Sequence, residues 1–197
     1  MKYIGLVLLI LFSGCSTTHP PVVTYKIDPQ IKTNNKTTLK YPTSTLKVSE
    51  TFVDHSLRGI KIKYIDANQR EYSYNNSRYA QELNLAITNS IIKTIKDAKI
   101  FKNVVSYRSK AKAQLYLEVN LYEFMQYFSK DEKKSYVKVD IDLDLIDNKT
   151  LKIIKSKRFK KQKDTNSADA HGGIEALNET LAEIEKEIII WLGNDDK

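Results

Sequence analysis

The side chains that could do chemistry are few and far apart in the sequence. The 197-residue chain has one cysteine and three histidines, Cys15, His19, His55 and His171. A metal site or a general base would need these histidines to converge with carboxylates, because metals take several ligands and a base must reach its substrate. The sequence contains no Gly-x-Ser-x-Gly turn and no Gly-rich phosphate loop. We therefore predict a protein that is not an enzyme, with no metal, no cofactor and no catalytic residue.

Cys15 ends an N-terminal segment that is typical of export. Lys2 precedes the apolar run 4–12, which is too short to cross a bilayer, and two small residues follow that run. The sequence Phe12-Ser13-Gly14-Cys15 resembles the lipobox of bacterial lipoproteins, with Phe12 where leucine is usual. This resemblance implies cleavage before Cys15 and acylation of its thiol. The alternative is an ordinary signal peptide, or an uncleaved anchor, that happens to contain a cysteine.

The expected organisation follows from that processing site. Residues 1–14 form the signal peptide, and 15–40 a lipidated N-terminus and flexible polar tether with a candidate short strand at 22–27. Such a tether of about 25 residues would span on the order of 80 Å when extended. Residues 41–193 form a single α+β domain, and 194–197 a polar tail.

The net charge of the chain limits the classes of partner that it is expected to bind. The net charge is +8, and loss of Lys2 with the signal peptide leaves +7. A basic balance is compatible with nucleic acid, anionic lipid or an acidic protein, and export argues against nucleic acid. Once Cys15 is acylated, no thiol remains for a disulfide, so stability must come from packing.

Two segments, 115–122 and 137–145, alternate apolar and polar residues in the manner of half-buried strands. Further strand-like segments are 46–53, 59–65, 71–74 and 151–163. Apolar residues three and four apart predict amphipathic helices over 78–96 and 174–192. The expected fold is an α+β two-layer sandwich, with a mainly antiparallel sheet of about five or six strands and both helices on one face.

The last strand and the last helix carry specific expectations. Placing Leu151 and Ile153 on the apolar face predicts that Lys152 lies opposite Asp144. The second helix is expected to begin after Gly172-Gly173, with a row of glutamates on its solvent side. That row comprises Glu175, Glu179, Glu183 and Glu187.

Three surface features have two interpretations each. The first is a basic run that serves either as edge protection or as a contact for anionic lipid or an acidic partner. Its candidate contact residues are Lys155, Lys157, Arg158, Lys160 and Lys161. The second is the row Asp140, Asp142 and Asp144, which is either a cation site or a solvated face paired with lysines. The third is the set of strand tyrosines, which either pack within the sheet or form an aromatic interface. These tyrosines are Tyr72, Tyr74, Tyr116, Tyr122, Tyr127 and Tyr136.

The order of these pieces resembles the ABC-type transport auxiliary lipoprotein family, the lipoprotein component of MCE-type phospholipid transport systems of the Mla and Pqi kind. The matching pieces are the lipobox, Tyr25-Lys26-Ile27, the strand pair 59–64 and 71–74, the segments 75–80 and 101–104, the long hairpin and the closing helix. Tyr79 stands where members often carry tryptophan.

This resemblance implies a non-enzymatic accessory component of intermembrane phospholipid transport, with MCE-type transporter components as partners. The acyl chains would hold the protein in the membrane, and a homo-oligomer is a further expectation. The alternative function is a structural or assembly lipoprotein, for example one that aids lipopolysaccharide insertion. The expected location is the periplasmic side of the envelope. The outer membrane is favoured because Ser16, rather than aspartate, follows Cys15.

Overall fold

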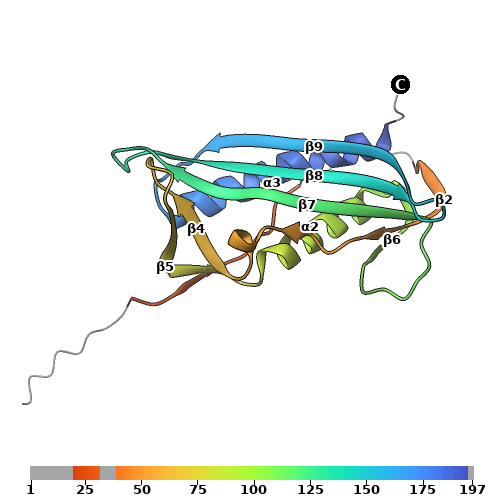
Figure 1. Ribbon diagram of the computed structural model, residues 1–197, viewed down its shortest axis with the longest axis horizontal. Coiled ribbons are helices and arrows are strands. Elements are labelled where there is room, and N and C mark those ends of the chain that lie inside the picture. The colour runs from red at the N-terminus through yellow and green to blue at the C-terminus, as the bar shows by residue number, and fades with distance from the viewer. Residues whose placement is uncertain (1–19, 32–38, 195–197) are drawn as a thin grey trace, which may run out of the picture.

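The computed structural model describes residues 20–31 and 39–194, and these form an α+β body with one mixed sheet and two α-helices (Figure 1). The strands are β1 (Val23–Tyr25), β2 (Tyr41–Val48), β3 (Phe52–Val53), β4 (Lys61–Ile65), β5 (Glu71–Tyr79), β6 (Phe101–Ser106), β7 (Leu115–Phe128), β8 (Ser135–Asp147) and β9 (Lys152–Asp164). The helices are α2 (Leu83–Ala98) and α3 (Ala170–Gly193), and a 3-10 turn, η1, covers His55–Leu57. The two-layer α+β prediction is confirmed. The sheet of the described residues has nine strands rather than five or six.

The long strand β7 is the centre of the sheet. On one side it pairs antiparallel with β8, which in turn pairs antiparallel with β9. On its other side the short strands β2, β3 and β4 pair with it one after another, all parallel to it. Strand β5 is antiparallel to β4, while β1 and β6 add in parallel at β5 and β2. The antiparallel part therefore comprises the hairpins, as expected, and the short flanking strands make the sheet mixed.

The core lies between the helices and one face of the sheet. In Figure 1 both helices lie on the same side of the strands, with α3 against β8 and β9 and α2 against β6. The predicted alternation is confirmed, because Leu117 and Leu143 are fully buried while Glu118 is exposed. Burial of each such aliphatic side chain contributes roughly 1.5–3 kcal/mol, so the facing stripes on the helices and strands hold the two layers together. Within the described residues, neither helix is long and apolar enough to cross a bilayer.

The first helix starts later than predicted. Residues 78 and 79 belong to β5, and α2 begins at Leu83. Residues 75–77 resemble a helix N-cap, but no helix begins there because the backbone is hydrogen-bonded within the sheet. Tyr79 donates its N–H to the Ile60 carbonyl, and β1 pairs along the other side of β5. Tyr79 is itself a core residue, with 4% of its surface exposed.

The second helix starts earlier than predicted. Helix α3 begins at Ala170, and the Asp169 carboxylate caps it by accepting the Gly172 N–H at 2.8 Å. The two glycines lie inside the first turn of α3. Their surroundings leave no room for a Cβ, so a larger residue would not fit at either position. A Cβ on Gly173 would come within 2.6 Å of Gln126 Cδ, and one on Gly172 within 2.8 Å of the Ser167 nitrogen.

The predicted register of the last hairpin is wrong. Lys152 pairs with Asp147 and not with Asp144, whose partner is Ser156. A bulge at the start of β9 changes the register, so Lys155 takes the inward position opposite Leu145. As a result Leu151 and Ile153 are not on the apolar face but are 75% and 59% exposed.

Candidate functional site

Cys15 lies outside the described residues, and the first residue that is described, Pro20, follows it by five positions. The candidate short strand is present as β1. It adds in parallel to the edge of β5, and the Ala80 N–H donates to the Tyr25 carbonyl at 2.7 Å. The segment Val23–Tyr25 of the expected tether is therefore attached to the body. Five residues span at most about 18 Å.

Residues 26–31 continue across the two helices, and Asn178 of α3 holds them there. The Asn178 side chain donates to the Lys26 carbonyl at 3.3 Å and accepts the Asp28 N–H at 2.9 Å. Lys93 of α2 lies 3.6 Å from the Asp28 carboxylate, and Pro29 is buried. One side chain thus satisfies backbone groups on both sides of Ile27. We call residues 23–31 the N-terminal clamp.

Replacing Asn178 by alanine is expected to loosen the N-terminal clamp without unfolding the body. Loss of two hydrogen bonds of about 1 kcal/mol each should raise amide hydrogen exchange at residues 26–31 by roughly tenfold or more. Hydrogen exchange with mass spectrometry measures this. Asn166→Ala is the matched control, because Asn166 bonds only the Glu175 side chain. Equal exchange in both variants would show that Asn178 does not hold the clamp.

A buried carboxylate, Glu185, lies beneath this clamp between the helices. It has no exposed surface, and its two oxygens accept hydrogen bonds from Ser90 at 2.5 Å and from Thr94 at 2.6 Å. Burial raises the pKa of Glu185 to about 7, against the opposing effect of the two hydroxyls and of Lys93. A cavity of about 340 Å³ adjoins it, lined by residues 27–31 and by Ser90 and Thr94.

Glu185 is not among the site residues predicted from the sequence. Its spacing nevertheless indicates a buried position. Glu185 lies four residues after Leu181 and three before Ile188, on the apolar side of the helix.

The structure places the predicted basic contact residues in intramolecular contacts. Arg158 donates two hydrogen bonds to Asp140, at 2.7 and 2.8 Å, and Lys160 Nζ lies 3.0 Å from the same carboxylate. Lys155 is buried and donates to the carbonyl of Asn194 at 2.6 Å, at the C-terminal end of α3 where a cation is favourable. Lys157 Nζ lies 5.0 Å from the centre of the Phe159 ring. These contacts give the basic residues structural roles. Their contact with lipid or with a partner protein stays a prediction.

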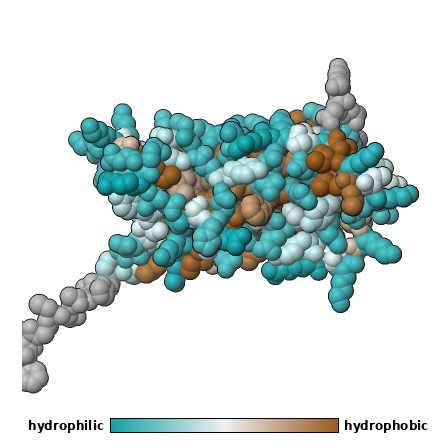
Figure 2. All heavy atoms as spheres, in the orientation of Figure 1, coloured by the Kyte–Doolittle hydropathy of each residue, from teal (hydrophilic) through white to brown (hydrophobic). Residues whose placement is uncertain are grey.

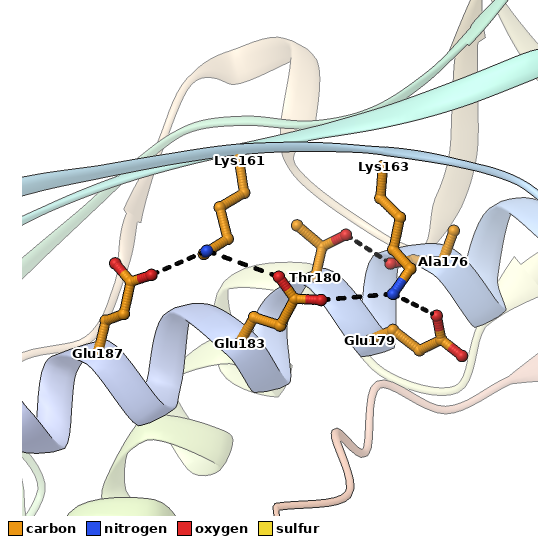
Figure 3. A network of polar contacts seen from close by, with 7 residues as sticks. All are labelled: Lys161, Lys163, Ala176, Glu179, Thr180, Glu183 and Glu187. Carbon is orange, nitrogen blue, oxygen red and sulfur yellow. Dashed lines mark hydrogen bonds and ion pairs between the residues drawn. The ribbon is translucent and has the colours of Figure 1, made fainter.

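Lys161 joins β9 to α3 through the predicted row of glutamates (Figure 3). It lies 2.8 Å from Glu187 and 3.5 Å from Glu183, while Lys163 lies 2.8 Å from Glu179 and 3.3 Å from Glu183. The glutamates raise the pKa of both lysines by hydrogen bonding to the charged form. These glutamates therefore face the sheet edge. Because the side chains are partly exposed, each pair contributes at most about 1 kcal/mol.

The aspartate row does not form a cation site in the described residues, where no group of three or more His, Cys, Asp or Glu side chains is arranged to hold a metal. Burial pushes the pKa of Asp140 up, but hydrogen bonds from Arg158 and Lys160 outweigh it and hold that pKa below its usual value. Asp144 lies opposite Glu118 on β7 and Ser156 on β9. The row thus splits into one aspartate paired with basic residues and two on the outer face.

The strand tyrosines pack mainly against one another. Tyr127 and Tyr136 stack across β7 and β8 with ring centres 5.2 Å apart, and Tyr64 contacts both Tyr72 and Tyr74. The hydroxyl of Tyr74 donates to the buried Gln126 at 2.9 Å. Sheet packing therefore accounts for these rings. Tyr122 differs, since it is 44% exposed and carries Arg158 over its ring.

The described histidines are far apart in the fold. His55 belongs to η1 after β3, while His171 lies in the first turn of α3 with its ring 6.3 Å from that of Tyr25.

Comparison with known proteins identifies the fold. No protein-family model matches the chain, and no curated protein matches it. Among solved structures, it is similar to protein XCC0632 from Xanthomonas campestris, described as DUF330, with a TM-score of 0.77 and 13% identity over 87% of this chain and 95% of that one. An uncharacterized protein matches with a TM-score of 0.66 and 14% identity over 87% and 99%. A putative lipoprotein from Caulobacter crescentus matches with a TM-score of 0.38 and 14% identity over 74% and 87%. The similarity to the first two structures, at these identities, shows a shared fold alone.

Proposed function

We propose that the chain is a non-enzymatic lipoprotein, anchored through Cys15 on the periplasmic side of the envelope, that serves an ABC/MCE-type intermembrane phospholipid transport system. The observation that carries this proposal is the order of its parts, a lipobox followed by the N-terminal clamp and a two-layer body with the fold of a DUF330 protein. Its partners would be components of the transporter. It would also form a homo-oligomer, and the outer membrane is its favoured location.

The clamp supports this function because it joins the anchor to the body. With residues 23–31 attached, a lipid on Cys15 would hold the body close to its membrane, within about 18 Å of the point where the described chain begins. Two or more acyl chains make such an anchor stable, whereas a single chain binds only marginally.

Replacing Cys15 by serine is expected to abolish palmitate labelling and to release the protein from the membrane fraction, because the chain has no other cysteine to carry a thioether. Crosslinked envelopes that contain the wild-type protein should yield MCE-type transporter components. Recovery of lipopolysaccharide-assembly proteins in their place would favour the alternative function. Recovery of neither class would contradict both.

A further inference from the structure

The turn between β8 and β9 exposes three aliphatic side chains together. Leu151, Ile153 and Ile154 are 75%, 59% and 45% exposed. Figure 2 shows apolar surface gathered over the end of the molecule where β9 begins. Lys149 and Lys152 are exposed in the same turn. We call these five residues the hairpin tip.

Leu151 is unfavourable for folding in two ways. Its φ of 57° places it in the left-handed region, which suits glycine or asparagine and disfavours a leucine. Its side chain is also the most exposed of the large apolar ones in the described residues. The turn itself does not require leucine, because Asp147 organises it by accepting the N–H groups of Lys149 and Thr150 at 2.9 and 2.7 Å. Neither the backbone conformation nor burial therefore explains an aliphatic residue at this position.

The neighbouring loop makes this end of the molecule strongly basic. The loop 107–114 meets the turn at its C-terminal end, since Asn148 donates its backbone N–H to the Gln114 carbonyl and its side chain to the Ala113 carbonyl, both at 2.9 Å. Loop and turn together carry five basic side chains and one carboxylate, that of Asp147. The basic side chains are Arg108, Lys110, Lys112, Lys149 and Lys152.

The geometry points to a membrane-contacting surface: the hairpin tip binds an anionic lipid bilayer, with its aliphatic side chains among the acyl chains and its lysines at the headgroups. A protruding turn with few aliphatic residues and several lysines suits an interfacial depth of several ångströms. Stable protein interfaces are larger, about 800 Å² on each partner, and are depleted in lysine. The outer sheet face beyond the tip mixes both signs of charge, since Asp142 lies opposite Arg158 and Asp144 opposite Glu118.

The position of the tip bears on which bilayer it meets. In Figure 1 the described chain begins at the end of the molecule that holds β5, and the β8–β9 turn lies at the opposite end. Strand β8 alone has 13 residues, or about 45 Å. If Cys15 is an anchor, which rests on the proposed function, a body that stands upright on its membrane holds the tip on the far side, where it would meet a second lipid surface. A body that lies flat would bring the tip to the same membrane.

Vesicle binding by the chain from residue 16 onward tests the tip independently of the anchor, since that chain contains every described element and no acyl chain. It should co-sediment with phosphatidylglycerol vesicles and not with phosphatidylcholine vesicles. Leu151→Asn should weaken binding roughly tenfold through lost apolar burial. The pair Lys149→Gln and Lys152→Gln should weaken it roughly twentyfold at low salt. Leu151→Asn should also leave the urea midpoint equal or higher, because asparagine tolerates a positive φ.

Matched controls lie elsewhere on the surface. Phe52→Ser removes an apolar side chain that is 56% exposed, and the pair Lys130→Gln and Lys133→Gln removes two charges from the β7–β8 turn. Both controls should bind like wild type. Equal losses in controls and tip variants, or no preference of wild type for phosphatidylglycerol, would overturn the proposal. A protein captured by a photocrosslinker at position 151 without any vesicle binding would assign the tip to a protein partner.

The second-surface inference has its own test. Cys15 is the only cysteine, so a chain that begins there can be coupled to maleimide-bearing phosphatidylcholine vesicles at that one position. The coupled vesicles should cluster on addition of phosphatidylglycerol vesicles, and Leu151→Asn should remove the clustering. Tip binding without clustering would retain the lipid site but overturn its reach to a second membrane. Neither outcome depends on the transport partner.

Discussion

Replacing Glu185 by glutamine is expected to raise the free energy of unfolding by about 3 kcal/mol at pH 8. Glu185 is fully buried, and burial raises its pKa from 4.5 to about 7. Above pH 7 the folded protein must hold a buried charge, and a pKa difference of this size corresponds to about 3 kcal/mol. Glutamine keeps an oxygen and a nitrogen for the hydroxyls of Ser90 and Thr94 and carries no charge.

The pH dependence follows from the direction of this shift. Between about pH 4.5 and pH 7 the folded state holds a proton on Glu185 that the unfolded state has released, so raising the pH favours unfolding. The wild type should therefore lose stability across this window and change no further above it through this group. Glu185→Gln should remove this contribution. Carboxylates whose pKa is lowered, such as that of Asp140, affect stability only at more acidic pH.

Urea unfolding followed by the fluorescence of Trp191, the only tryptophan, measures both effects at several pH values. Glu183→Gln is the control. Glu183 belongs to the same helix, and its side chain is 46% exposed and paired with lysines, so its replacement should change stability by less than about 1 kcal/mol. A Glu185→Gln variant that is no more stable than wild type at pH 8 would show that burial does not raise the pKa of this carboxylate in the folded state.

Replacing Gly173 by alanine is expected to destabilise the fold by about 3 kcal/mol, although helix propensity alone favours alanine by about 1 kcal/mol. The new Cβ would lie 2.6 Å from Cδ of Gln126, a side chain that is 1% exposed. Gln126 cannot move freely, because it bonds Tyr74, Ser135 and the Asp169 carbonyl. Either the start of α3 or this network must shift.

A double-mutant cycle separates the clash from other effects. Gln126→Ala removes the group that the Cβ meets, so the double variant should be more stable than the sum of the single changes predicts, by about 1–2 kcal/mol. Thermal or urea unfolding of the four proteins measures this coupling. Simple additivity, or a Gly173→Ala variant within about 0.5 kcal/mol of wild type, would show that the helix start tolerates a Cβ.

The regular parts of the fold could be predicted because they follow from local periodicity. Alternation in β7 and β8 and the apolar stripes of α2 and α3 each depend on residues within one element, so the α+β class and the helical face could be inferred. The predicted start of the first helix failed for a nonlocal reason, because residues 77–79 pair with β1 and β4. The start of α3 is decided locally by its N-cap, Asp169, and the prediction missed that signal.

The candidate sites were less predictable than the fold. The basic run at 155–161 was evident as charge, but its pairing with Asp140 and the α3 glutamates depends on register and helix placement. The exposed aliphatic residues of the hairpin tip were expected in the core, because one bulge changes which side of β9 faces inward.

The sequence by itself determined the apolar patterns and the fold class, because each follows from residues close together in the chain; the processing signal around Cys15 stays a prediction. Only the tertiary structure decided that the N-terminal clamp lies on α2 and α3, that Glu185 is buried beneath it, and that Leu151 is exposed at a basic end. The physical reason is that burial, pKa and charge pairing depend on which distant segments meet. Those contacts form only when the two layers pack.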